Sequence, residues 1–184
     1  MVSEDQSLPR IPPLTHPDAA TAETLNKTLI GTEVDGPLNV FKTLAQHPAL
    51  LKRFNVLGGF FMTKGLLDPA VREVSILRTA FLSGSEYEWL QHSQVARRVG
   101  ISSETINALR DSSPRLELEI LDLTVRITDQ IHSCGDLDDA LFAEGRKLLG
   151  EPALIELIML CGFYRMLANV LVTLRVQTDI APHA

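Results

Sequence analysis

The chain has 184 residues, a formal net charge of −6 and two cysteines. This length fits one domain with a sizeable core. The acidic balance argues against nucleic acid or an anionic membrane as a partner. With no apolar signal core near the N-terminus and no evident disulfide framework, the sequence predicts a soluble protein of the cytoplasm.

Apolar residues recur at helical spacing along the chain, and no strand pattern is evident, so an all-α fold is expected. Prolines in residues 1–17 predict an extended arm. We divide the chain into an N-terminal arm and short helix (1–37), a helical domain (38–176) and a C-terminal tail (177–184). The expected helices are 18–30, 38–56 with a possible break at His47-Pro48, 69–82, 86–98, 102–109, 114–133, one that Asp136 caps and Gly150 ends, and 151–176, with a loop at 31–37.

The last expected helix is apolar nearly all round, which is typical of a helix that is buried on most sides. It also contains Glu156, Arg165 and Asn169. Charged residues are costly at the centre of a bilayer. We therefore interpret this helix as the central core helix or as part of a subunit interface, and not as a membrane span.

The hairpin of the two helices over 69–98 carries the best evidence for chemistry. Asp68-Pro69 predicts the start of its first helix, and Ser83-Gly84-Ser85 ends that helix and begins the next. Glu88 and His92 lie four positions apart, so they share a helix face. In an antiparallel hairpin the first turn of the first helix, which contains Glu73, faces the region of His92. The sequence predicts that the three groups converge.

Each of these residues also has a purely structural interpretation. His92 could simply lie on an exposed helix face. Glu88 could be a surface charge, or a group that only orients His92. Glu73 could be there to complement the positive end of its own helix dipole. Zinc sites use His and Glu together, but only one histidine is convincing here, so no metal is predicted.

Four neighbouring residues are weaker candidates. Arg72 could bind a substrate carboxylate or pair with a nearby glutamate. Ser85 fits a helix N-cap or a residue that binds substrate, and Tyr87 a hydrogen-bond donor to substrate or a packing residue. Trp89 fits the core.

The pattern Arg72-Glu73, Ser85-x-x-Glu88-x-x-x-His92, then Gly100-Ile101-Ser102 resembles the carboxymuconolactone decarboxylase and alkylhydroperoxidase D (AhpD) superfamily. The resemblance is specific over residues 68–102. In the peroxidase branch, cysteines stand at the positions of Ser85 and Glu88. Their absence places this chain nearer to the decarboxylase-like members. The resemblance implies an AhpD-like helical domain that forms a homo-oligomer, a trimer or hexamer, and needs no cofactor.

Three hypotheses for function follow. The first is an acid–base enzyme for a small organic acid or lactone, in which His92 moves the proton, Glu88 orients the imidazole and Glu73 completes the relay. The second is a peroxidase-type oxidoreductase that uses Cys134 or Cys161 as an atypical thiol. The third is a non-catalytic oligomer that binds a small acid.

Overall fold

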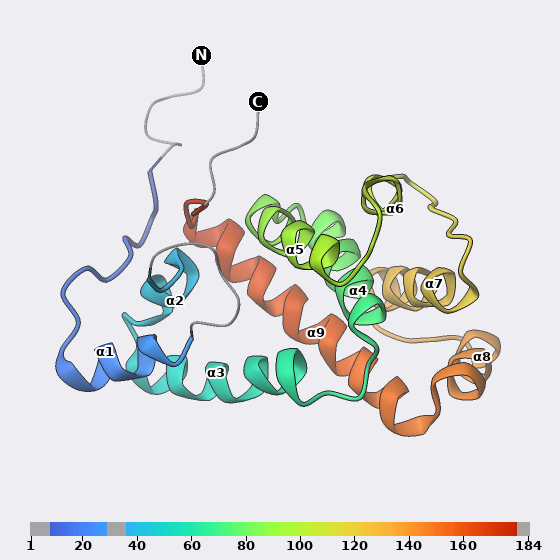
Figure 1. The fold of residues 1–184 in the computed structure, drawn as a ribbon, viewed down its shortest axis with the longest axis horizontal. Helices are drawn as coiled ribbons and strands as arrows, with labels where there is room; N and C mark the ends of the chain where they lie inside the picture. Colours follow the sequence, from blue (N-terminus) through green and yellow to red (C-terminus); the bar gives the residue numbers. More distant parts are fainter. Residues whose placement is uncertain (1–7, 29–35, 180–184) are drawn as a thin grey trace, which may run out of the picture. The chain divides into compact units, whose positions relative to one another are not determined.

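The computed structural model describes residues 8–28 and 36–179, and the regular structure in these ranges is entirely helical (Figure 1). The expected all-α fold is confirmed. The expected loop at 31–37, the start of the arm and the end of the tail lie partly or wholly outside the described residues.

Two compact units divide at residues 64/65 and 169/170, so the expected boundary at 37/38 falls inside the first unit. The helices are α1 (Ala19–Asn26), α2 (Asn39–Leu44), α3 (Pro48–Thr63), α4 (Pro69–Leu82), α5 (Glu86–Arg98), α6 (Ser103–Ala108), α7 (Glu119–Cys134), α8 (Asp139–Leu149) and α9 (Glu151–Leu174).

The first unit contains α1, α2 and α3, which pack around a small core of Leu25, Ala45 and Leu51. The expected break at His47-Pro48 is present, because α2 ends at Leu44 and α3 begins at Pro48. Proline at the first helical position needs no N–H partner, and His47 Nδ1 accepts a hydrogen bond from the backbone N–H of Leu50 at 3.4 Å.

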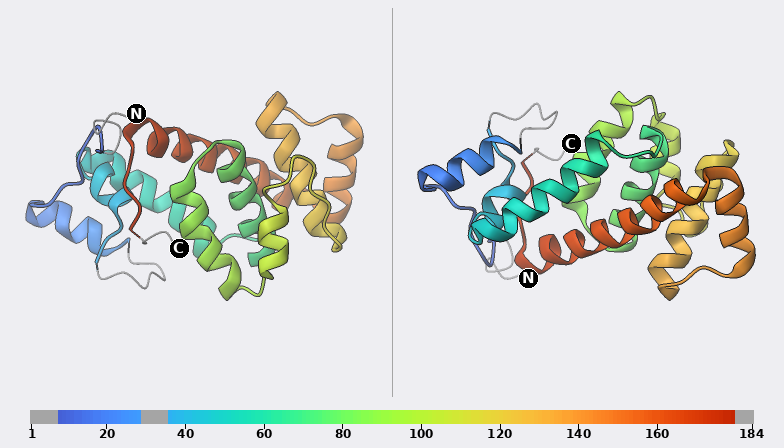
Figure 2. Two further views of the ribbon diagram at one scale, coloured as in Figure 1. Left: turned by 90° about the horizontal axis from the view of Figure 1, so that it is seen from above. Right: turned by 90° about the horizontal axis from the view of Figure 1, so that it is seen from below.

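Helix α4 is the centre of the second unit, where it packs against both α5 and α7. Every residue from Val71 to Ala80 is buried. Its start is fixed locally, since the Asp68 carboxylate accepts from the N–H of Ala70 at 2.8 Å and Pro69 follows. The chain then reverses at Gly84, whose φ of +65° favours glycine. Figure 2 shows the resulting hairpin of α4 and α5 (green), and α7 beside α8.

Two expected helix starts were wrong, each because a carboxylate binds a different backbone N–H. Helix α7 begins at Glu119 and not at residue 114, since Asp122 accepts from the N–H of Leu116 at 3.2 Å and the chain before the helix is extended. Helix α8 is capped by Asp138, which accepts from the N–H of Leu141 at 2.8 Å, and not by Asp136.

Helix α9 ends at Leu174 and is long and apolar enough, by length and composition, to cross a membrane. Only 44% of its most apolar window is buried. One such helix is weak evidence for a span, because a core helix of a soluble protein has the same properties. Buried Leu157 and Leu160 alternate with exposed Ile155 and Met159, so one face of α9 belongs to the core.

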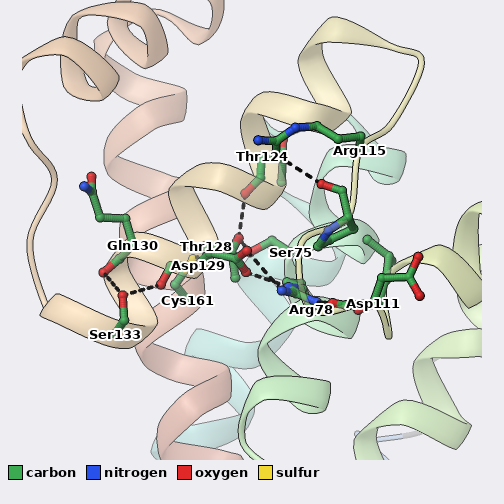
Figure 3. Close-up of polar contacts among 12 residues, drawn as sticks. Ser75, Arg78, Asp111, Arg115, Thr124, Thr128, Asp129, Gln130, Ser133 and Cys161 are labelled. Carbon is green, nitrogen blue, oxygen red and sulfur yellow. Dashed lines mark hydrogen bonds and ion pairs between the residues drawn. The ribbon is translucent and has the colours of Figure 1, made fainter.

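The most completely bonded side chain of the second unit is Arg78, which is 2% exposed (Figure 3). Its Nε and Nη2 atoms donate to the carboxylate of Asp129 on α7, at 2.5 and 3.0 Å. Its Nη1 atom donates to the backbone carbonyls of Leu109 and Asp111, both at 2.8 Å. One guanidinium therefore joins α4, α7 and the segment that follows α6.

We expect Asp129→Ala to lower the free energy of unfolding by about 3 kcal/mol or more, because it leaves a buried arginine without its counter-ion. Glu144→Ala is the matched control, since it removes one of the two carboxylate partners of Arg126, which is 32% exposed. That change should cost about 1 kcal/mol or less. Urea denaturation of the two variants measures both values, and equal losses would contradict the role given to Arg78.

Candidate active site

The centre of the candidate site is a contact between Glu73 on α4 and His92 on α5. Glu73 Oε2 lies 2.7 Å from His92 Nδ1. The Glu73 side chain is fully buried and that of His92 is 14% exposed. The predicted approach of Glu73 to His92 is present, although Glu73 lies just after the first turn of α4, and it brings an imidazole onto a buried carboxylate.

The other oxygen of Glu73 accepts a hydrogen bond from Arg72 Nε at 2.9 Å. Burial by itself raises the pKa of Glu73, but the charges and hydrogen bonds of His92 and Arg72 outweigh it and hold the pKa below its usual value. Because arginine stays charged at any physiological pH, Arg72 supports the ionised carboxylate even beside a neutral imidazole. Of the two roles considered for Arg72, substrate binding and an ion pair with a nearby glutamate, the structure shows the ion pair, with Glu73.

An ionised carboxylate can only accept hydrogen bonds. When the His92 ring is neutral, its proton must therefore be on Nδ1, the atom that faces Glu73. The lone pair then lies on Nε2. Among the described residues, no group hydrogen-bonds to this nitrogen. The arrangement is that of an oriented base whose second nitrogen remains available for proton transfer.

Glu88 has the opposite environment. It is 2% exposed, and neither carboxyl oxygen has a hydrogen-bond partner among the described residues. Burial raises the pKa of Glu88 to about 8, and the neighbouring Ser85 hydroxyl offsets only part of this rise. The geometry between the two side chains does not meet that of a hydrogen bond. Glu88 is therefore mainly neutral at pH 7. The expectation that Glu88 orients His92 was wrong, because Glu73 occupies that position.

Tyr164 on α9 completes the cluster. Its ring lies edge-on to the His92 imidazole, with centroids 5.0 Å apart and planes at 88°. Burial raises the pKa of the Tyr164 hydroxyl, and the negative charges of ionised Glu73 and Glu88 raise it further. The sequence offered no signal for this contact, since nothing local fixes the distance from α9 to α5.

The other candidates have structural positions. Tyr87 is buried but lies one residue from Glu88, on a different face of α5. Trp89 is in the core as expected, edge-on to Phe81 with ring centroids 6.5 Å apart. Ser85 stands at the N-cap of α5, but its hydroxyl makes no capping hydrogen bond.

The two thiols differ in setting. Cys134 is exposed at the end of α7. Cys161 is buried, and burial raises its pKa even though Ser75 and Thr128 are its hydrogen-bond partners, with Ser75 Oγ at 3.3 Å (Figure 3). Within the described ranges, no group of three or more His, Cys, Asp or Glu residues is placed to hold a metal ion.

Residues 48–114 match the Carboxymuconolactone decarboxylase family. This range contains α4, the α4–α5 turn and α5, and therefore every predicted site residue. A search of curated protein sequences finds no match to the chain.

Solved structures share the fold at low sequence identity. A peroxidase-related protein from Silicibacter sp. is 14% identical, with a TM-score of 0.71 over 90% of this chain and 95% of that one. An Agrobacterium tumefaciens protein named as a putative antioxidant defence protein AhpD is 19% identical, with a TM-score of 0.64 over 75% and 96%. The debrominase Bmp8, in complex with 2,3,4-tribromopyrrole, is 15% identical, with a TM-score of 0.68 over 92% and 91%.

The raised pKa of Glu88 predicts a loss of stability as pH rises. Below its ordinary pKa of 4.5 both the folded and the unfolded chain hold the proton; between 4.5 and about 8 only the folded chain keeps it. The free energy of unfolding should therefore fall by up to about 1.4 kcal/mol per pH unit over this window. Glu88→Gln should remove most of this slope in urea titrations from pH 5 to 9.

The matched control is Glu86→Gln, which removes an exposed carboxyl from the first turn of the same helix. This variant should keep the wild-type slope. If Glu88→Gln also keeps it, Glu88 is ionised in the folded protein and the assignment of a neutral acid fails.

Proposed function

We propose that this chain, of which residues 48–114 match the Carboxymuconolactone decarboxylase family, is a cofactor-independent acid–base enzyme of the cytoplasm. Its substrate would be a small organic acid or lactone, and its reaction a decarboxylation or a related proton transfer. One observation carries the proposal: His92 bonds to an ionised Glu73 beside a Glu88 that has no partner and a raised pKa. Two carboxyl groups of opposite protonation state are the usual basis of acid–base catalysis at neutral pH.

In this proposal His92 is the base. Its Nε2 atom accepts a proton from the substrate, and Glu73 stabilises the imidazolium that forms. Arg72 acts through Glu73, which it keeps ionised. A direct contact of Arg72 or Tyr87 with substrate stays a prediction.

Glu88 is the acid in the same scheme. When the bond to a departing CO₂ breaks, its electron pair passes into an extended enolate, and the Glu88 proton forms the new C–H bond. A buried carboxylate remains, which is unfavourable without a partner and so regains a proton from solvent. The imidazolium of His92 releases to solvent the proton that it took from the substrate, so the resting enzyme is restored and the cycle needs no other reactant.

The thiol alternative has weaker support, although one structure of similar fold is named as peroxidase-related and another as a putative antioxidant defence protein. Ser85 and Glu88 stand where that branch has its cysteines. Cys161 is buried with a raised pKa, so it is mainly a thiol and not the nucleophilic thiolate. These environments favour acid–base chemistry over peroxide reduction.

Self-association as a trimer or hexamer also stays a proposal. Exposed Ile155, Met159 and Met166 on α9 support it, because large exposed apolar side chains gathered on one helix are typical of interfaces. The molar mass from light scattering would decide it, and a monomer at micromolar concentration would contradict it.

We expect the wild-type protein to release CO₂ from 4-carboxymuconolactone, and His92→Ala to lower the rate by about 10²–10⁴-fold. Glu73→Gln should lower it to a similar degree, because the amide no longer stabilises an imidazolium. His16→Ala is the control, since His16 is exposed and lies outside the site. Wild-type activity in a folded His92→Ala protein would refute the role of the imidazole.

Maleimide titration tests the thiol alternative. In the native protein we expect Cys134 alone to react, and Cys161 to react only after denaturation. Cys134→Ser should then leave turnover unchanged. Fast labelling of native Cys161, with loss of activity, would instead favour the atypical thiol.

A further inference from the structure

Tyr164 has no part in the proton transfers proposed above, yet it contacts the base. It is 5% exposed on α9, and its ring lies edge-on to His92, with centroids 5.0 Å apart and planes at 88°. A perpendicular arrangement is one of the two that aromatic pairs prefer. His92 therefore has a second neighbour in addition to Glu73, and this neighbour comes from a different helix.

The hydrogen bond between His92 and Glu73 does not fix the imidazole by itself. It holds Nδ1, whereas the proposed proton transfer takes place at Nε2, on the other side of the ring. The torsion about the Cβ–Cγ bond of histidine is broad, and a hydrogen bond tolerates a considerable tilt before it weakens steeply. A ring held at one nitrogen can therefore swing the other through an arc. A second contact, against the ring itself, is needed to hold the direction of Nε2.

The part of α9 that carries Tyr164 is held against the helix that carries Glu73. One turn before Tyr164, Cys161 Sγ lies 3.3 Å from Ser75 Oγ of α4 and 3.7 Å from Thr128 Oγ1 of α7 (Figure 3). Thr128 Oγ1 lies 3.2 Å from Ser75 Oγ, and all three side chains are buried. A slide of α9 along α4 would break these buried contacts, so Glu73 and Tyr164 keep their relative positions.

The Tyr164 ring can hold the imidazole without altering the charge of the site. Burial raises the pKa of its hydroxyl, so the side chain stays an uncharged phenol at neutral pH. It adds no negative charge that would compete with Glu73 for the imidazolium. Buried Phe163 lies edge-on to the same ring, with centroids 5.5 Å apart, and limits its movement.

We propose that Tyr164 is a positioning residue for His92, whose ring packs against the imidazole and holds the direction of Nε2 while Glu73 holds Nδ1. The inference rests on the proposed function, since it adds a residue that acts through the base of that reaction. It also gives Cys161 a structural role, in the contact that fixes α9. The ring of Tyr164 carries the effect and its hydroxyl does not, which makes the assignment testable.

The test follows the His92 imidazole by NMR in protein labelled with ¹⁵N-histidine, with His92→Ala to assign its signals. The rate at which the Nδ1 proton exchanges with water reports how often the bond to Glu73 opens. Tyr164→Leu removes the ring but keeps a large apolar side chain. At the same pH we expect exchange about two- to tenfold faster than in the wild type, the effect of losing one perpendicular aromatic pair.

Tyr164→Phe is the rescue variant, because it keeps the ring and removes only the hydroxyl. Exchange should stay at the wild-type rate. Leu154→Ala is the control for general loosening, since Leu154 is 2% exposed near the start of the same helix, beside Gly145 of α8. It should lower the melting temperature without faster exchange at His92.

Turnover of 4-carboxymuconolactone gives a second readout. Tyr164→Leu should lower kcat with little change in KM, because a misdirected Nε2 impairs a step that follows binding. A rise in KM with kcat unchanged would instead assign Tyr164 to the wall of the substrate site and overturn the positioning role.

Three NMR results would also overturn it: wild-type exchange in Tyr164→Leu, equally fast exchange in Tyr164→Phe, or equally fast exchange in Leu154→Ala. If Tyr164→Leu does not fold, the wild-type protein should still show a nuclear Overhauser effect between the ring protons of His92 and Tyr164, and its absence would refute the contact. The NMR readouts need no turnover. An inactive protein therefore leaves the positioning role open to test, and a failure of positioning leaves the catalytic test of His92→Ala untouched.

Discussion

The second unit depends on how α4 is held, because this helix is buried over ten consecutive residues and yet carries charge. Arg78 provides the constraint. Its guanidinium is bonded to Asp129 and to two backbone carbonyls, so α4 is fixed against α7 and against the segment after α6. Tight packing around a fully bonded charge leaves α4 little freedom to rotate. The orientation of Glu73, which lies on the same helix, is set in consequence.

Two glutamates illustrate how the site separates acid from base. Glu73 and Glu88 are both almost fully buried, and burial raises the pKa of each. Glu73 has Arg72 and His92 as partners, and its pKa falls below the usual value. Glu88 has no such partner, and its pKa rises. The difference lies in the partners and not in the depth of burial.

Much of the fold follows from local sequence, because a helix start needs only a nearby side chain. Asp68-Pro69 fixes α4 in this way, and the reversal at Gly84 makes the approach of Glu73 to His92 predictable. The predictions fail where the outcome depends on which of several possible partners a side chain binds. Asp122 reaches back to Leu116 and delays α7, and the partner of His92 is the glutamate across the hairpin and not the one four residues before it on its own helix. Tyr164 comes from another helix altogether, and no local pattern marks it.

The ion pair between Arg72 and Glu73 has a consequence for how such a site changes over evolutionary time. Since Arg72 Nε lies 2.9 Å from the buried carboxylate, replacement of the imidazole would still leave Glu73 one ion-pair partner in the interior. The reactive group and the folding of its helix are thus partly independent. Lineages that share this hairpin could exchange the residue at position 92, and with it the chemistry, at little expense to the scaffold.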